Sequence, residues 1–124
     1  MLIDLETPYG SDDPEVRHLN RMFVRACARD CLMRGEIPFA SHMLYTQPGV
    51  LDDTDPVERE LGIKAGKEWT KVAEKTVVYT DRGISRGMKF GIDLAEKLGR
   101  PVEYRELGFI PDPEVFSDGK WMER

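Results

Sequence analysis

Residues 76–102 read TVVYTDRGISRGMKFGIDLAEKLGRPV and contain, in order, the patterns of a buried strand, a glycine-rich turn, a helix and the start of another strand. Thr76–Thr80 is β-branched and aromatic, which is typical of a parallel strand covered on both faces. Ser85 lies between two glycines and can cap the helix that follows, and Gly99 marks the end of that helix. The stretch therefore predicts a strand-helix-strand unit of a parallel sheet.

Upstream of this unit, the sequence contains two more strand patterns and two more helix patterns. Met1–Leu5 is a short apolar run that suits a first strand, and Ile37–Leu44 has the pattern of a second strand running into a loop. Helices are expected to begin at Pro14 and at Pro56, because each proline follows an aspartate that can cap the first turn. Downstream, Pro101–Leu107 alternates like a half-exposed last strand.

The alternation of strands and helices along the chain predicts an α/β fold. We expect a small Rossmann-like (flavodoxin-like) three-layer domain with a mainly parallel sheet of four or five strands. The 124 residues suffice for one compact domain, which we assign to residues 1–107. Residues 108–124 have no clear period, and we expect a C-terminal tail that packs on the domain or on a neighbouring subunit.

The composition excludes several classes of partner. The formal net charge of −5 disfavours nucleic acid, because the overall field repels phosphate backbones. No apolar run approaches the roughly 20 residues of a membrane span, so no membrane partner is expected. Met1–Leu5 lacks the pattern of a signal peptide, and we therefore expect a cytoplasmic protein.

The sequence predicts neither a metal site nor a cofactor. Cys27 and Cys31 are four residues apart in a helical stretch, which indicates core thiols and matches no usual metal spacing. The acidic loop at residues 52–55 offers carboxylates for a cation, but Asp55 is better explained as a helix cap in a box with Glu58. Both the glycine fingerprint of dinucleotide folds and the Walker loop are missing from the sequence, which disfavours NAD binding and ATP hydrolysis.

A ligand site is expected where the carboxyl ends of the strands meet. Three loops should converge there: Thr7–Asp13, Tyr45–Asp55 and Asp81–Gly87. A phosphate or sugar would fit the turn at Gly83, because the next helix points free N–H groups into it; the alternative is a tight connection that binds nothing. The side chains that these segments offer for stacking and hydrogen bonding are Thr7, Tyr9, His42, Tyr45, Gln47, Asp81, Ser85 and Arg86.

Two segments carry a resemblance to a known enzyme family: TPYG at residues 7–10 and VVYTDRGISRGMKFGIDLAEKLGRPV at residues 77–102. The second resembles the nucleoside 2-deoxyribosyltransferase family, in which a strand ending in aspartate leads to a glycine-rich helix start and a closing G-K-P-V. Asp81 matches the acidic strand end, and Gly87 and Met88 match the helix start. The segments ASHMLYTQPGVLDD and GISRGM also resemble small, often phage-encoded domains of the same superfamily.

The resemblance covers residues 1–107 and implies a Rossmann-like domain that handles a nucleoside or nucleotide. It also implies a homo-oligomer, a dimer or tetramer, whose sites are completed by a neighbouring chain. The motifs extend the expected ligand-binding set by Pro8, Gly10, Gly87, Met88 and Lys89.

The sequence departs from the family at its nucleophilic glutamate, which falls on Lys89 in a gap-free alignment and on Gly91 if the helix is aligned at Gly99. Neither residue can form the glycosyl ester. The carboxylates that remain as catalytic candidates are Asp81, Glu60 and Asp93, with Glu58 as a further option. An ion pair with Lys89 is the alternative for Asp93, and a favourable interaction with the helix dipole is the alternative for the two glutamates.

The sequence alone favours two classes of function. One is an enzyme that acts on an N-glycosidic bond or a related nucleotide bond. The other is a non-catalytic module that senses or sequesters a nucleotide; Lys89 beside Arg86 at a helix start favours such an anionic ligand. A structural interaction protein whose turn stays empty is the third possibility.

Overall fold

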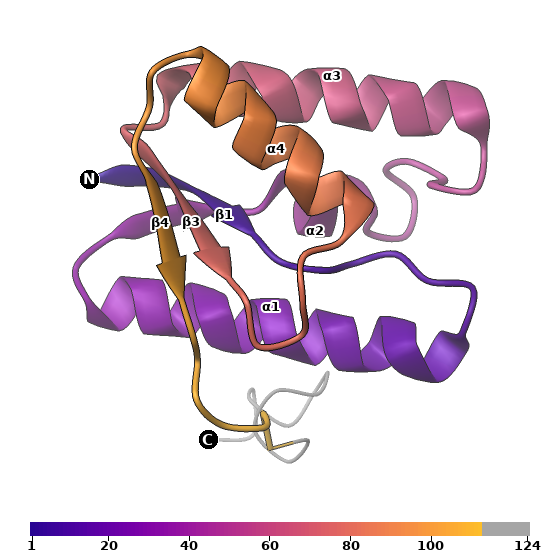
Figure 1. The fold of residues 1–124 in the computed structure, drawn as a ribbon. Helices are drawn as coiled ribbons and strands as arrows, with labels where there is room; N and C mark the ends of the chain where they lie inside the picture. The colour runs from indigo at the N-terminus through magenta and orange to yellow at the C-terminus, as the bar shows by residue number, and fades with distance from the viewer. Residues whose placement is uncertain (113–124) are drawn as a thin grey trace.

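The computed structural model describes residues 1–112, which form a four-stranded parallel sheet covered by helices on both faces (Figure 1). The strand order is β2 (Ile37–Phe39), β1 (Leu2–Glu6), β3 (Lys75–Tyr79) and β4 (Val102–Arg105). Every neighbouring pair is parallel. The structure confirms the predicted α/β class and the three-layer arrangement.

The two faces of the sheet are covered by different helices (Figure 1). Helix α1 (Pro14–Met33) covers one face, while α3 (Pro56–Val72) and α4 (Arg86–Lys97) cover the other. The larger core cluster lies on the α1 side and contains both cysteines, as predicted: Ile3, Leu5, Phe23, Val24, Cys27, Cys31, Ala40, Val77 and Tyr79. The cluster on the α4 side is smaller and consists of Val78, Met88 and Ile92.

Strand β1 is apolar on one face and acidic on the other. Ile3 and Leu5 pack in the larger core cluster, so the alternation of a strand turns Asp4 and Glu6 toward α3 and α4. This acidic face is unusual inside a parallel sheet, whose strands are normally apolar on both sides.

The predicted helix starts are confirmed by the hydrogen bonds at their caps. The side chains of Asp13 and Asp55 each accept a backbone N–H of the following turn, and Ser85 accepts the Met88 N–H at 3.3 Å. The box predicted between Asp55 and Glu58 forms only in part, because the Glu58 carboxylate accepts the N–H of Asp52.

The prediction of a strand over Ile37–Leu44 is wrong beyond Phe39. Residues Ser41–Tyr45 form a short helix, α2, whose first turn is closed by bonds from the Met43 and Leu44 N–H groups to the Ala40 carbonyl. The turn places the His42 side chain against the end of β1, a tertiary contact that overrides the local pattern. Strand β2 is thus a three-residue edge strand with Pro38 in its centre.

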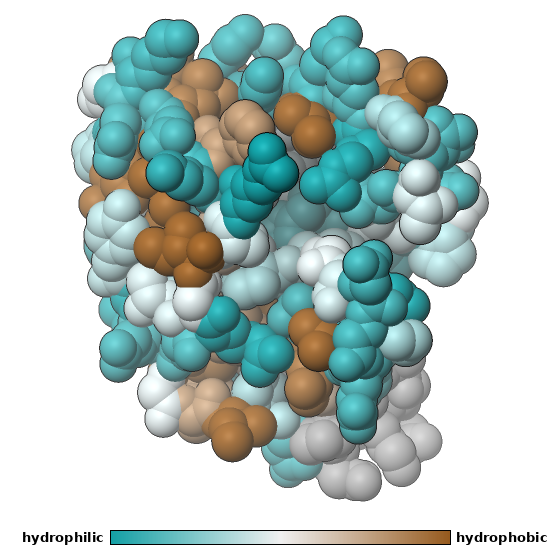
Figure 2. All heavy atoms as spheres, turned by 45° about the vertical axis from the view of Figure 1, so that its right-hand side comes forward, coloured by the Kyte–Doolittle hydropathy of each residue, from teal (hydrophilic) through white to brown (hydrophobic). Residues whose placement is uncertain are grey.

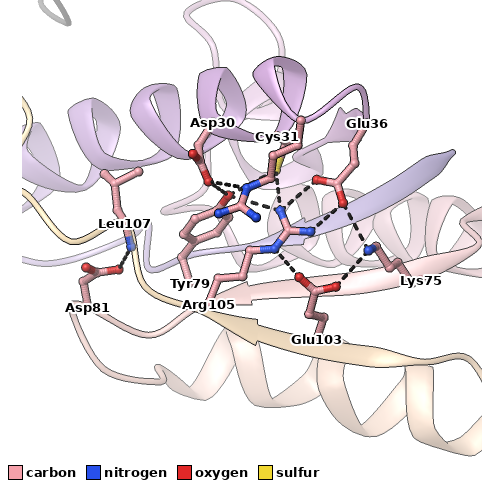
Figure 3. Close-up of polar contacts among 10 residues, drawn as sticks. Asp30, Cys31, Glu36, Lys75, Tyr79, Asp81, Glu103, Arg105 and Leu107 are labelled. Atoms are coloured by element: carbon pink, nitrogen blue, oxygen red, sulfur yellow. Dashed lines mark hydrogen bonds and ion pairs between the residues drawn. The ribbon is translucent and has the colours of Figure 1, made fainter.

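A network of charged side chains fixes β4 to the region where α1 ends (Figure 3). The Arg105 guanidinium pairs with Glu36 and with Glu103, and the Lys75 ammonium lies 3.1 Å and 2.9 Å from the same two carboxylates. The hydrogen bond from Arg105 is the main reason that the pKa of Glu36 is lowered to about 2. The network therefore has a structural role.

No helix in residues 1–112 is long and apolar enough to cross a membrane. The predicted packing of the C-terminal tail concerns residues 113–124 above all, and these lie outside the described part of the chain.

Candidate functional site

The strand order reverses at β1, because the chain passes from β1 to β2 on one side and then returns to β3 on the other. The next helices, α1 and α4, lie on opposite faces of the sheet, so the loops after β1 and β3 diverge (Figure 1). Ligands of open α/β sheets bind at this kind of crevice. Figure 2 turns this side of the molecule forward and shows a hollow bordered mostly by hydrophilic side chains.

Thr7, Tyr9 and His42 meet at the carboxyl end of β1, as the convergence of loops predicted. The Thr7 hydroxyl lies 3.0 Å from His42 Nε2, and the Tyr9 ring meets the imidazole edge-on at 5.2 Å. Burial lowers the pKa of His42 to about 4, so the ring is neutral at neutral pH. The group offers a neutral imidazole, a hydroxyl and an aromatic ring.

The loop after β3 is tied to the loop after β1 through Asn20, a buried residue of α1 that the sequence reasoning missed. Arg82 Nε donates to the Asn20 side-chain oxygen at 3.0 Å, and the Asn20 amide donates to the Tyr9 carbonyl at 3.1 Å. The sequence does contain a signal for Asn20, because its side-chain amide stands alone within the apolar face of the helix.

The loop at residues 45–55 lies close to the loop after β1, but the polar groups of two of its predicted site residues are bonded elsewhere. A Cβ added at Gly10 would lie 3.7 Å from the Asp53 carboxylate, so the two loops are close. The Tyr45 hydroxyl instead accepts the Trp69 indole N–H at 2.7 Å, and the Gln47 amide donates to the Met43 carbonyl. Both polar groups therefore bond to nearby residues of α2 and α3 and do not point toward the loop after β1.

The start of α4 presents several predicted ligand-binding residues to solvent. Gly83 has a φ of 83°, which explains why the turn needs glycine there. Ser85 caps the helix, and Arg86 and Lys89 are exposed. Pro8 lies beside the Thr7 group and is buried.

The three predicted catalytic carboxylates have different surroundings. Asp81 accepts the backbone N–H group of Leu107 at 2.7 Å (Figure 3) and that of Gly108 at 2.9 Å, and so holds the segment after β4. Glu60 lies 3.5 Å from Lys64 on the exposed side of α3. Asp93 is exposed, and within the described residues it forms no ion pair with Lys89.

Two carboxyl groups that the sequence reasoning missed lie at the strand reversal. Burial raises the pKa of Asp4 to about 6, and the Thr70 hydroxyl donates to this carboxylate at 2.9 Å. Burial, and then the charge of Asp4, raise the pKa of Glu6 well above its usual value. The sequence contained a signal for them. Two acidic residues at alternate positions of a buried strand lie on the same face of the sheet and are therefore both buried.

Glu6 points toward Gly91 of α4. A Cβ added at residue 91 would overlap the Glu6 carboxyl group, so the absence of a side chain there creates the space that Glu6 occupies. Of the two positions that the family resemblance offers for its glutamate, Lys89 is exposed and Gly91 faces the end of β1.

The fold of this chain is similar to that of a solved 2-deoxyribosyltransferase from the psychrotolerant bacterium Bacillus psychrosaccharolyticus. The two chains are 20% identical, with a TM-score of 0.60 over 93% of this chain and 80% of that one, which is a likeness of fold. The family model described as "Domain of unknown function (DUF7768)" matches residues 1–105, and the chain belongs to that family. A search of curated proteins found no match.

Proposed function

We propose that the protein binds a nucleoside or nucleotide and acts on, or recognises, its N-glycosidic or ribose-phosphate part. The observation that carries the proposal is the meeting of Thr7, Tyr9 and His42 directly after β1, whose last residue, Glu6, faces Gly91 of α4. The fold shared with a 2-deoxyribosyltransferase supports the same class of ligand.

The chemistry of these groups suits the parts of a nucleoside. A tyrosine and an imidazole offer faces and edges for a flat base, and carboxyl and hydroxyl groups hydrogen-bond sugar hydroxyls. The free N–H groups of α4, with Arg86 and Lys89, suit a phosphate.

A non-catalytic nucleotide-binding module remains the alternative. It is favoured by one observation: the helix position that faces the end of β1 is Gly91, and the exposed residue two positions earlier is Lys89, so α4 supplies no carboxylate at either position.

A thermal-shift screen tests the proposal. The probes are 2′-deoxyadenosine, thymidine, adenosine, AMP and ribose 5-phosphate, with inorganic phosphate and adenine as partial ligands. A ligand at about 100 times its Kd adds about 2.7 kcal/mol, or roughly 10 °C in Tm for a domain of this size. A flat response to every probe would refute the proposal.

The assembly that we propose is a cytoplasmic homo-oligomer, a dimer or tetramer. Its support in the structure is α3, which buries only Thr70 and exposes large apolar side chains along its length.

A further inference from the structure

Helix α4 carries two glycines one turn apart, and one of them, Gly91, faces Glu6. Residues four apart in a helix lie on one face, so Gly87 and Gly91 both leave that face of α4 bare. The Glu6 carboxyl group fills the position in front of Gly91, whereas a Cβ at Gly87 would meet nothing within 4 Å. Open space therefore begins one helical turn from Glu6, at the start of α4.

The Glu6 carboxyl group is largely enclosed and forms no hydrogen bond or ion pair with any other residue between 1 and 112. Buried polar groups are almost always paired, and an unpaired carboxyl group costs stability. The neighbouring Asp4 differs, because the Thr70 hydroxyl bonds to it and it lies two residues deeper along β1. Of the two acids, Glu6 is the one placed to meet a ligand.

Resting on the proposed function, we propose that Glu6 is the catalytic acid of this site and that it promotes hydrolysis of a nucleoside at its N-glycosidic bond. The open space in front of Gly87, one helical turn from Glu6, admits the sugar and base to its carboxyl group.

The step balances with water as the second reactant. The neutral Glu6 carboxyl group gives its proton to a ring nitrogen of the base while the C1′–N bond breaks and its electron pair passes to that nitrogen. Water adds to C1′ of the sugar and returns a proton to the Glu6 carboxylate. The products are the free base and the free sugar.

The surroundings of Glu6 are those that such an acid needs. A carboxyl group that is shielded from water stays protonated at higher pH than a solvated one and can therefore donate its proton. The other titratable groups in this region are Asp4, whose charge disfavours ionisation of Glu6, and His42, which is neutral.

The test measures release of free base by chromatography from 2′-deoxyadenosine, thymidine, adenosine and AMP. Glu6→Gln keeps the shape of the side chain and removes the proton donor, so it should lower kcat at least 100-fold, since general acids contribute about 10²–10⁴. It should also abolish the fall in kcat at alkaline pH that deprotonation of Glu6 produces in the parent. The matched control is Glu96→Gln, an exposed position on α4 that should leave turnover unchanged.

A second pair of variants guards against a purely structural effect. Glu6→Ala should be inactive, and Glu6→Ala combined with Gly91→Glu returns a carboxyl group to the same space from the opposite wall. We expect the double variant to recover at least tenfold over Glu6→Ala alone. Circular dichroism and urea unfolding report whether each variant folds.

The outcomes separate this inference from the proposed function. If the parent releases base and Glu6→Gln retains kcat within threefold, Glu6 is not the acid, while the proposed function stands. If calorimetry shows that the parent binds a probe but no base is released, the acid role fails and the binding alternative holds. If the parent neither binds nor cleaves any probe, both proposals fail.

Discussion

At the scale of single residues, the acidic face of β1 is a feature that weakens the fold. A parallel strand stabilises the sheet best when both of its faces are apolar, yet Asp4 is only 4% exposed. Thr76, its neighbour on β3, has a buried hydroxyl without a partner among the described residues. Native proteins keep such costly groups mostly where function requires them.

Asp4→Asn is predicted to stabilise the protein at pH 8. The pKa of Asp4 is raised to about 6, so the folded state binds its proton more tightly than the unfolded chain does. This favourable contribution is complete below about pH 4 and is lost as the pH rises through 6, a change of about 3 kcal/mol. Asparagine has no proton to lose. Urea unfolding should show the variant more stable at pH 8, by up to about 3 kcal/mol, and similar to the parent at pH 4.

The exposed Asp93→Asn serves as the control and should change stability little at either pH. In the Asp4→Asn variant, the pH dependence of stability that comes from Asp4 is absent, so the opposite dependence that comes from His42 should become visible. The pKa of His42 is lowered to about 4, so its contribution is lost as the pH falls from 6.5. A variant with equal or lower stability than the parent at pH 8 would contradict the argument.

At the scale of helices and strands, the sequence predicted most of the fold because its local signals were strong. The caps at Asp13, Asp55 and Ser85 are short-range chemistry and can be recognised without tertiary information. Helix α2 was missed, because a five-residue helix is set by tertiary contacts, here that of His42 with Thr7.

The candidate site was predicted only in part for a similar reason. Loop convergence follows from topology and could be foreseen, whereas the contact of His42 with Thr7 and Tyr9 depends on helix α2, which was not predicted. The pairing of Glu6 with Gly91 joins residues 85 positions apart and depends on how α4 packs, which a strand pattern does not specify. The predicted first strand also ended at Leu5, one residue too early.

Arg86→Ala is predicted to weaken binding of AMP at the start of α4. The guanidinium is exposed beside the free N–H groups of the first turn, where a charged hydrogen bond contributes about 1.5–3 kcal/mol. Calorimetry should show a loss of tenfold or more in affinity for AMP and little change for adenosine. Lys97→Ala, at the other end of the helix, is the matched control. Equal affinity for AMP in the parent and the Arg86 variant would place the anion elsewhere.

Arg105→Leu is predicted to destabilise the sheet by about 1.5–3 kcal/mol at pH 7, because the partly buried Glu36 carboxylate loses its charged hydrogen bonds from Arg105 and keeps only Lys75. The pKa of Glu36 is lowered, so the stability it contributes is present above about pH 4.5 and is lost as the pH falls toward 2. The defect should therefore shrink in acid.

Urea unfolding measures the effect, and the double variant Arg105→Leu with Glu36→Leu is the control. Removing both charges should recover much of the loss, because neither group is then left unpaired. A double variant that is less stable than Arg105→Leu would contradict this explanation, because the Glu36 side chain would then stabilise the fold even without Arg105.

At the scale of the whole molecule, the outer face of α3 predicts self-association. Val57, Leu61, Trp69 and Val72 are 70%, 54%, 42% and 56% exposed, and their spacing places them along one side of the helix. A contiguous apolar surface of this kind usually marks an interface.

Leu61→Glu is predicted to convert a dimer or tetramer into a monomer, because it puts a charge in the centre of this apolar surface. Light scattering at tens of micromolar protein measures the mass. Lys67→Glu adds the same acidic group on a polar, exposed part of α3 and should leave the mass unchanged. A parent protein that is monomeric under these conditions would remove the prediction.

The proline in β2 limits how copies of the chain can join. The Ile37 N–H donates inward to the Met1 carbonyl, so by the alternation of a strand the Pro38 nitrogen faces outward and offers no donor there. Edge strands with free donors are templates for endless sheet extension between molecules. Because this edge is three residues long and lacks its central donor, growth of fibrils by strand addition at β2 is disfavoured.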